Sequence, residues 1–191
     1  INEPFAVINA DDYYGAGSFH LIADFLAKDC SPSLMAMVGY TLSNTLSEHG
    51  TVNRGVCKVD TDDNLVEVIE RTKIAAQYGV VNYNVGDDLP LGIVDKNVPV
   101  SMNYWGFHPS IFNEIEKGLH DFMRANPDNP TAEYYIPNII TDMIVSKQIA
   151  VRVIHTDDNW FGVTYKEDKP MAVAAITKCI TDDVYPTNLW S

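Results

Sequence analysis

Two adjacent carboxylates follow an apolar run near the start of the chain, in Phe5-Ala6-Val7-Ile8-Asn9-Ala10-Asp11-Asp12-Tyr13-Tyr14-Gly15. The run from Phe5 to Ala10 is almost continuously apolar, which is typical of a strand buried on both faces. It stops at Asp11-Asp12, and Ser18 can then act as the N-cap of a helix. The pattern predicts a strand, a turn and a helix, with both carboxylates at the carboxyl end of the strand.

Apolar runs and turn-forming residues alternate along the rest of the chain. We expect strands at 34–40, 55–59, 65–69, 75–83, 98–107, 149–154 and 160–164, with a hairpin turn at 60–64 and a loop at 86–97. We expect helices to begin near Ser18, Ser110, Thr131 and Asp168. Strands alternate with helices at both ends, and a hairpin-rich section lies between them. This order predicts a single α/β domain over residues 1–191, a three-layer α/β/α arrangement with a mixed sheet.

The composition is that of a folded, acidic protein. Apolar residues make up 46% of the 191 residues, and 26 Asp and Glu outnumber 13 Lys and Arg, so the net charge is −13. Such a charge repels phosphate backbones and anionic lipid headgroups, so we expect neither a nucleic-acid polymer nor a membrane as partner. No apolar run reaches about 18 residues. Three widely spaced cysteines argue against a disulfide framework and indicate a reducing, cytoplasmic location.

The carboxylate pair is the first candidate site. Mg²⁺ binds carboxylate oxygens together with substrate phosphates, so Asp11 could let an acidic protein handle a phosphorylated substrate. The alternative is structural, because aspartates at strand ends also form turns and cap helices. The second candidate is Glu70-Arg71, since Glu accepts hydrogen bonds from sugar hydroxyls and Arg binds phosphate oxygens. Its alternative is a solvated strand end with a surface ion pair.

Two further segments contain candidate residues. Asn103 lies inside an apolar strand, so its amide needs a partner in the protein or in a ligand. Gly106, beside aromatic residues, permits close approach to the backbone. Before the last predicted helix, Lys166 could neutralise a phosphate and Asp168 could bind a metal ion. The alternatives are an internally satisfied Asn103, a solvated Lys166, and Asp168 as the N-cap of the helix.

Taken in order, these segments resemble the sugar nucleotidyltransferase family over nearly the whole chain. Phe5–Gly15 resembles the family's central strand with its metal-binding Asp. Arg54-Gly55-Val56, followed by 66–71, resembles the hairpin that leads to its Glu-Lys pair. Residues 101–109 resemble the family's next strand-to-helix segment. Two further stretches, 161–170 and Tyr185-Pro186-Thr187-Asn188-Leu189-Trp190, resemble a bacterial subgroup of the glucose-1-phosphate uridylyltransferase or mannose-1-phosphate guanylyltransferase type.

The resemblance implies a type-A glycosyltransferase-like, truncated Rossmann-like fold and a Mg²⁺-dependent reaction. Such enzymes join a sugar 1-phosphate to a nucleoside triphosphate: a sugar-phosphate oxygen attacks the α-phosphorus in line, and pyrophosphate leaves. Carried over by position, Asp11 would hold Mg²⁺ and Glu70 would accept hydrogen bonds from the sugar. Arg71, where the family usually has Lys, would contact the sugar phosphate, and Asn103 would line the sugar pocket. Lys166 would join Asp11 as a catalytic group.

Two features depart from the family pattern. The Gly-rich loop that grips the triphosphate is expected upstream of Ile1. We therefore expect this chain to be the carboxyl-terminal, sugar-phosphate-binding part of a longer protein, and to be inactive alone. The family also places a second metal-binding Asp near Gly162, which has no side chain to bind a metal. Asp168, Asp157 or Asp158 could take its place.

Other functions remain open for the same residues. A non-catalytic domain could retain the fold as a sugar-phosphate sensor or an assembly module, and the glycine at position 162 favours this reading. A type-A glycosyltransferase would consume a nucleotide sugar, but Asp11-Asp12 lacks the Asp-x-Asp spacing of such metal sites. A partial domain would also expose a sheet edge or face that a second copy could cover, as in a homo-oligomer.

Overall fold

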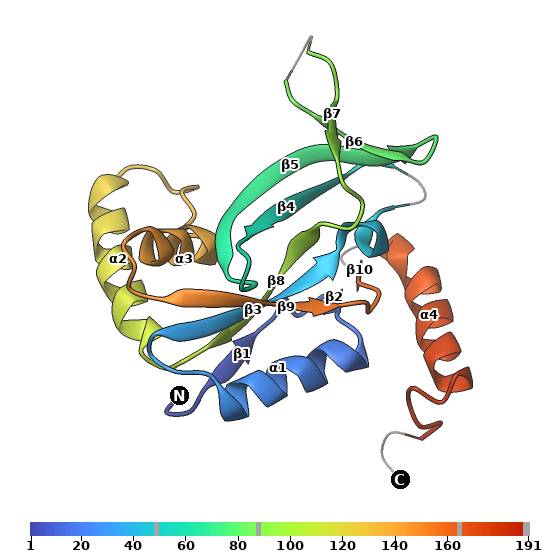
Figure 1. Ribbon diagram of the computed structural model, residues 1–191, viewed down its shortest axis with the longest axis horizontal. Helices are drawn as coiled ribbons and strands as arrows, with labels where there is room; N and C mark the ends of the chain where they lie inside the picture. Colours follow the sequence, from blue (N-terminus) through green and yellow to red (C-terminus); the bar gives the residue numbers. More distant parts are fainter. Residues whose placement is uncertain (48–49, 87–88, 164–165, 189–191) are drawn as a thin grey trace.

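The computed structural model has a mixed α/β structure and describes residues 1–47, 50–86, 89–163 and 166–188. An eight-stranded sheet has the order β7-β6-β5-β4-β8-β3-β9, with β1 paired to β8, and β10 and β2 form a separate two-stranded sheet (Figure 1). Strand β9 is parallel to β3, whereas the other pairs of the described chain are antiparallel. The elements are β1 (Phe5–Val7), β2 (Asp12–Tyr13), α1 (Ala16–Lys28), β3 (Leu34–Thr41), β4 (Val52–Val59), β5 (Leu65–Gln77), β6 (Val80–Asn84), β7 (Gly92–Val94), β8 (Pro99–Phe107), α2 (Ile111–Ala125), α3 (Ile136–Val145), β9 (Ala150–Thr156), β10 (Phe161–Gly162) and α4 (Lys169–Thr181), with short 3₁₀ turns at Leu42–Thr45 and Lys166–Asp168.

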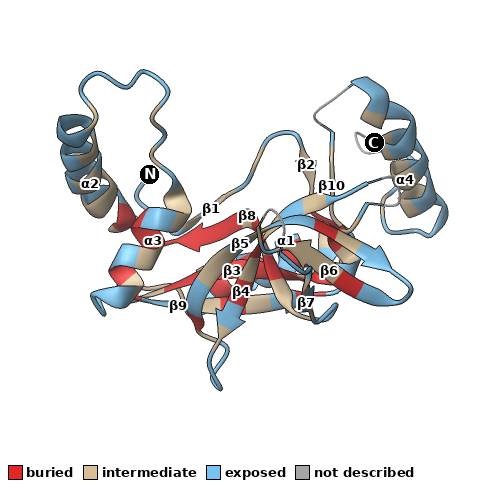
Figure 2. Ribbon diagram, turned by 90° about the horizontal axis from the view of Figure 1, so that it is seen from above, coloured by how far each residue is buried: buried red, intermediate tan, exposed pale blue. Residues whose placement is uncertain are grey.

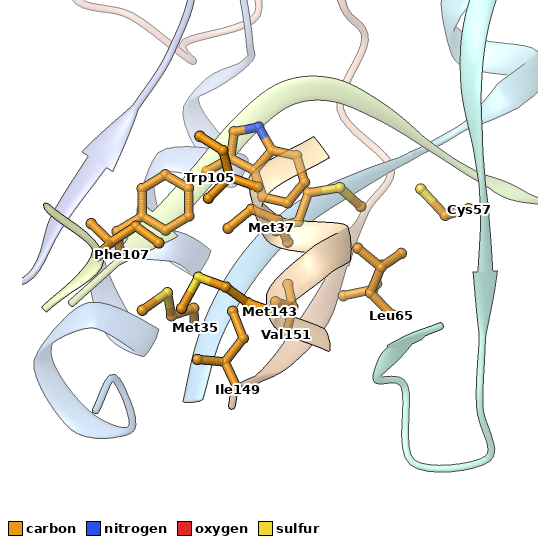
Figure 3. Packing of buried hydrophobic residues seen from close by; sticks show 13 residues of the cluster. Met35, Met37, Cys57, Leu65, Trp105, Phe107, Met143, Ile149 and Val151 are labelled. Carbon is orange, nitrogen blue, oxygen red and sulfur yellow. The ribbon is translucent and has the colours of Figure 1, made fainter. Parts of the chain in front are cut away.

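Alternating side chains of β3 divide the core between the two faces of the sheet. Met35 and Met37 lie in one cluster, which packs β8 and β9 against α2 and α3 (Figure 3). Ala36 and Val38 lie in the other cluster, which packs the opposite face against α1. Because β3 is covered on both faces, its sequence is continuously apolar. The buried residues accordingly gather in the central strands (Figure 2).

The predicted hairpin is confirmed. Strands β4 and β5 pair in antiparallel fashion across the turn at 60–64. There Asp60 Oδ1 accepts hydrogen bonds from the backbone N–H groups of Asp62, at 2.9 Å, and Asn64, at 2.8 Å. These bonds hold the pKa of Asp60 below its ordinary value. The acidic tract is therefore an Asx turn, as its composition indicates.

The opening strand differs most from its prediction. We expected a buried strand from Phe5 to Ala10, but β1 ends at Val7 and both Ala6 and Ile8 are exposed. The reason is its position, because within the described residues β1 pairs only with one end of β8. An apolar run alone does not distinguish such a strand from a central one.

The bounds of several other elements also differ from their predictions. Helix α3 begins at Ile136 and not at Thr131, because Pro137 fits only the first turn of a helix. A turn at Tyr78-Gly79 splits the extended segment expected at 75–83 between β5 and β6, and β7 lies in the stretch expected to be a loop. The strand expected at 160–164 is reduced to β10, and its last residue, Thr164, lies outside the described residues.

Helix α1 is capped by a residue far along the chain. The carboxylate of Asp158 accepts a 2.6 Å hydrogen bond from the backbone N–H of Ser18. The prediction that Ser18 is the N-cap is therefore wrong: α1 begins at Ala16, and the Ser18 hydroxyl lies 2.8 Å from the carbonyl oxygen of Tyr14. Gly15 has a φ of 83°, and a Cβ there would lie 2.6 Å from Asp158. Both the backbone conformation and the space thus require glycine.

Helix α4 lies at the periphery of the structure, and none of its residues is buried (Figure 1). The Tyr13 hydroxyl lies 3.5 Å from Cys179 Sγ and 3.2 Å from the Tyr185 hydroxyl, which joins α4 and the segment after it to β2. Asp168 occupies the N-cap position of α4. No described helix is both long enough and apolar enough to cross a membrane. Residues 189–190 of the tail that entered the family resemblance lie outside the described residues.

Candidate functional site

A cavity of about 910 Å³ opens where β4, β5 and β8 meet the turn after β1 and the start of α3. It brings together Asp11, Glu70 and Asn103, which are far apart in the sequence. Many of the lining side chains are polar, and part of the lining comes from the start of α3. The lining residues are Asn9, Asp11, Asp12, Asn53, Arg54, Gly55, Val68, Glu70, Ser101, Met102, Asn103, Tyr134, Tyr135, Ile136, Pro137, Asn138, Thr141 and Trp160.

Asp11 reaches the cavity from the turn between β1 and β2, and Asp12 reaches it as the first residue of β2. Asp11 is exposed, and its carbonyl oxygen accepts a 2.6 Å hydrogen bond from Val163 N–H. Asp12 is more tightly held, because Asn9 Nδ2 donates to its Oδ2 at 2.9 Å and the Tyr14 hydroxyl lies 3.2 Å from the same oxygen. Burial raises the pKa of Tyr14, and the charges of both aspartates raise it further. The Tyr14 hydroxyl therefore stays protonated, and its one O–H lies within hydrogen-bond distance of both Asp12 Oδ2 and the carbonyl oxygen of Met102, the latter at 2.9 Å.

Asn103 links the cavity wall to the core. Its φ of 59° lies in the left-handed region, which Asn tolerates better than most residues. Asn103 Oδ1 accepts a 2.8 Å hydrogen bond from Trp105 Nε1, and Asn103 Nδ2 donates to Asn9 Oδ1 at 2.7 Å. Because Asn9 also donates to Asp12, a chain of hydrogen bonds runs from the buried Trp105 to the acid pair. The amide of Asn103 thus has internal partners and also lies on the cavity wall.

Glu70 lies opposite Gly55 in the pairing of β5 with β4, and both residues line the cavity. A Cβ at Gly55 would lie 2.7 Å from Val68 Cγ1, so the glycine permits the close approach of Val68, whereas Glu70 Oε2 would be at an ordinary contact distance of 3.8 Å. Partial burial raises the pKa of Glu70, and the positive charge of Arg54 lowers it by less.

Arg54 is the functional candidate that sequence analysis missed. Its Nε donates to Thr45 Oγ1 at 3.2 Å, its Nη2 to Thr45 O at 2.6 Å and its Nη1 to Asn53 O at 2.7 Å. Its Cζ lies 4.8 Å from the centroid of the Trp160 ring. A signal did exist, because a hairpin turn at 60–64 pairs residues near 54 with residues near 70.

Two of the residues expected to bind substrate lie outside the cavity lining. The Arg71 guanidinium lies 4.5 Å from the centroid of the Tyr83 ring. Gly106 contacts α1, since a Cβ there would lie 2.8 Å from Ile22 Cδ1. The close approach that this glycine permits is therefore the packing of a helix against β8, which explains the residue without a ligand.

The candidates near the end of the chain are also absent from the cavity lining. Lys166 is exposed in a short 3₁₀ turn, and Asp168 follows at the N-cap of α4. Asp158 caps α1, and the carbonyl of Asp157 accepts a 3.1 Å hydrogen bond from Asn44 Nδ2. None of these aspartates lines the cavity beside Asp11.

The acid pair is the donor set that fits a hard cation best. Within the described residues, no group of three or more His, Cys, Asp or Glu side chains is arranged to hold a metal ion. Mg²⁺ needs less from the protein, because it keeps several waters and commonly binds one or two carboxylates together with substrate phosphates. Asp11, with Asp12 beside it in the same cavity, meets that requirement only when a phosphorylated substrate supplies further oxygens.

The lining combines carboxylate acceptors, side-chain amides and a guanidinium, a set that suits a polyhydroxylated ligand bearing negative charge. Comparison of the chain with models of known protein families and with curated proteins finds no match. The function therefore has to be inferred from the cavity and from the motifs that form it.

Proposed function

We propose that this chain carries the sugar-phosphate-binding part of a Mg²⁺-dependent nucleotidyltransferase, which joins a sugar 1-phosphate to a nucleoside triphosphate and releases pyrophosphate. The observation that supports this most is the shared cavity of Asp11, Glu70 and Asn103. If Asp11-Asp12 only formed a turn, nothing would require it to share a cavity with the other two motifs. Their order along the chain is also the order in which the family resemblance presents them.

The architecture is consistent with the same proposal. Helix α1 packs on one face of the mixed sheet, and α2 and α3 pack on the other. Asp11 follows the carboxyl end of β1, and ligands of open α/β sheets bind beyond the carboxyl ends of strands. We infer from this that the domain is a three-layer α/β/α domain of the type-A glycosyltransferase kind.

In the proposed reaction each residue of the cavity has a distinct task. Asp11 would hold Mg²⁺, and Asp12 adds negative charge from a fixed position. Bound Mg²⁺ offsets the charge that gathers on the phosphates. Glu70 accepts hydrogen bonds from sugar hydroxyls, and Asn103 presents an amide already oriented by Trp105. Their contribution is positioning, since a correctly held sugar phosphate needs no protein nucleophile.

A binding-only domain is the second candidate, and the observation that favours it is Gly162. This glycine lies opposite Asp12 and adds no second metal-binding carboxylate. A sugar-phosphate sensor or assembly module would use the same cavity but would form no pyrophosphate.

Turnover by the full-length protein distinguishes the candidates. The protein is incubated with glucose 1-phosphate or mannose 1-phosphate, each nucleoside triphosphate in turn, and Mg²⁺, with pyrophosphate release as the readout. Release that requires both substrates and Mg²⁺ supports the nucleotidyltransferase. Sugar-phosphate binding without release supports the sensor. Consumption of a nucleotide sugar with transfer of its sugar identifies a glycosyltransferase and contradicts the proposal.

A further inference from the structure

Arg54 carries the one positive charge among the described residues that line the cavity, which it shares with Asp11, Asp12 and Glu70. Even so, no carboxylate of the described chain lies within ion-pair distance of its guanidinium. A partly buried charge is normally paired. Glu70 and Asp12 act on the charge of Arg54 electrostatically, but neither forms an ion pair with it, which leaves its remaining N–H groups for an anionic oxygen of a ligand.

The guanidinium is oriented by neutral acceptors. Its hydrogen bonds go to Thr45 and Asn53, and its plane is further held over the Trp160 ring. These bonds use only some of its N–H groups, so the others can donate to a bound molecule. Burial lowers the pKa of Arg54, but a guanidinium remains charged in proteins.

A buried donor without an acceptor lies beside Arg54. Trp160 Nε1 is buried and has no hydrogen-bond partner among the described residues. A buried N–H without a partner is unfavourable, so a hydrogen bond from Trp160 Nε1 to an oxygen of a ligand, formed after a small movement of the ring, would be stabilising. Arg54 and Trp160, stacked on one another, therefore form a wall that lacks an oxygen ligand.

We propose, building on the sugar-phosphate function above, that Arg54 together with Trp160 binds an anionic group of the ligand, either a phosphate or a carboxylate. Guanidinium groups bind such oxygens through paired N–H donors. The family resemblance gave this role to Arg71, but Arg71 lies over Tyr83, outside the cavity lining. With the anion held by Arg54, the hydroxyls of the ligand face Glu70.

Calorimetric titration of this chain tests the proposal with glucose 1-phosphate, glucuronic acid and glucose as probes. Arg54→Gln should weaken binding of an anionic probe about 10-fold or more and leave glucose unaffected. Arg152→Gln is the matched control, because it removes one positive charge from an exposed pair with Asp29. Arg71→Gln tests the rival cation. The probe whose affinity falls more in Arg54→Gln, glucose 1-phosphate or glucuronic acid, shows whether the bound anion is a phosphate or a carboxylate.

Each result bears on the proposal. Four outcomes would overturn the proposal. Two concern the variants: unchanged binding by Arg54→Gln, or a loss of binding confined to Arg71→Gln. Two concern the unmodified protein: equal affinity for glucose and glucose 1-phosphate, or no binding of either anionic probe. If circular dichroism shows that Arg54→Gln is unfolded, Arg54→Lys decides. This variant keeps the charge but not the paired donors, so several-fold weaker anion binding supports the proposal and unchanged binding overturns it. Missing pyrophosphate release, with anion binding still dependent on Arg54, refutes the enzymatic function alone.

Discussion

Gly162 lies directly opposite Asp12 in the antiparallel pair of β10 and β2, and a Cβ at position 162 would stand 3.2 Å from Asp12 Oδ1. Residues opposite one another in an antiparallel pair point to the same side of the sheet. A carboxylate at position 162 would therefore meet that of Asp12. The present site has an acid on one strand and a glycine opposite it on the other.

Gly162→Asp should convert this arrangement into a two-carboxylate metal site. Repulsion between like charges should lower the melting temperature without metal. Mg²⁺ should raise the melting temperature again. The free energy of unfolding should increase by about 2.7 kcal/mol when the Mg²⁺ concentration reaches about 100 times the dissociation constant. Gly162→Asn, equal in size but neutral, should respond to Mg²⁺ no more than the unmodified protein. Equal responses of the two variants would show that the acid pair does not bind the metal.

Asp11→Asn should abolish turnover by the full-length protein while leaving its fold intact, because Asp11 is exposed and the change is isosteric. Loss of an essential metal ligand lowers kcat/KM by orders of magnitude. Pyrophosphate release is measured beside Asp24→Asn, which removes a carboxylate from an exposed ion pair with Lys28 on α1. Turnover within a few-fold of the unmodified protein would rule out Asp11 as the ligand.

Glu70→Gln should stabilise the ligand-free protein at neutral and higher pH. Burial raises the folded-state pKa of Glu70 above its unfolded value, so its stabilising contribution is complete below the unfolded pKa and disappears as pH rises through the folded pKa. Gln mimics the protonated form and keeps that contribution. Urea unfolding should give equal stabilities at about pH 3 and a more stable variant at about pH 8. The opposite pH trend would mean that Glu70 is stabilised as an anion.

Asp158→Ala should destabilise the protein by about 0.5–2 kcal/mol, the usual effect of losing a helix N-cap. The carboxylate accepts the Ser18 N–H at 2.6 Å and also lies at the positive end of the α1 dipole. Chemical denaturation provides the measurement, with Asp157→Ala as the neighbouring control, because Asp157 contacts Asn44 through its backbone carbonyl. Equal losses for the two variants would argue against a specific cap.

Asn103→Gly and Asn103→Val separate backbone conformation from side-chain function. Glycine accepts a φ of 59°, whereas a β-branched residue there is strained by about 1–3 kcal/mol. The valine variant should therefore be the less stable of the two in urea, while both lose the bonds to Trp105 and Asn9 and bind glucose 1-phosphate more weakly. Undiminished binding by the glycine variant would exclude the amide from ligand recognition.

Local signals predicted much of the fold. The tract at 60–64 indicated a hairpin because Asp60 can satisfy the turn by itself, and Ser110 preceded α2 as expected. Pro137 already contained the information that α3 begins near Ile136, since proline fits only the first turn. The length of β1 had no such signal, because an apolar run looks the same whether its edges are paired or not.

The candidate site was predicted less completely, since it depends on contacts between distant segments. Asp11, Glu70 and Asn103 were recognisable because each is a polar residue at the end of, or inside, an apolar strand. Arg54 and Asp158 were not recognised in their roles, because stacking on Trp160 and capping of α1 are made across the fold and have no local pattern. Arg71 was predicted to bind substrate because it follows Glu70 in the sequence. Glu70 lines the cavity, whereas Arg71 lies against Tyr83 outside the lining.

The hydrogen bond from Ser18 to Asp158 spans 140 positions of the chain. While the protein is being synthesised, α1 leaves the ribosome long before the residue that completes its first turn. The cap on its N-terminus forms only after the residues up to Asp158 have emerged, and contacts of such separation slow folding. The first turn of α1 therefore gains its carboxylate cap only after the segment that follows β9 has folded back onto it.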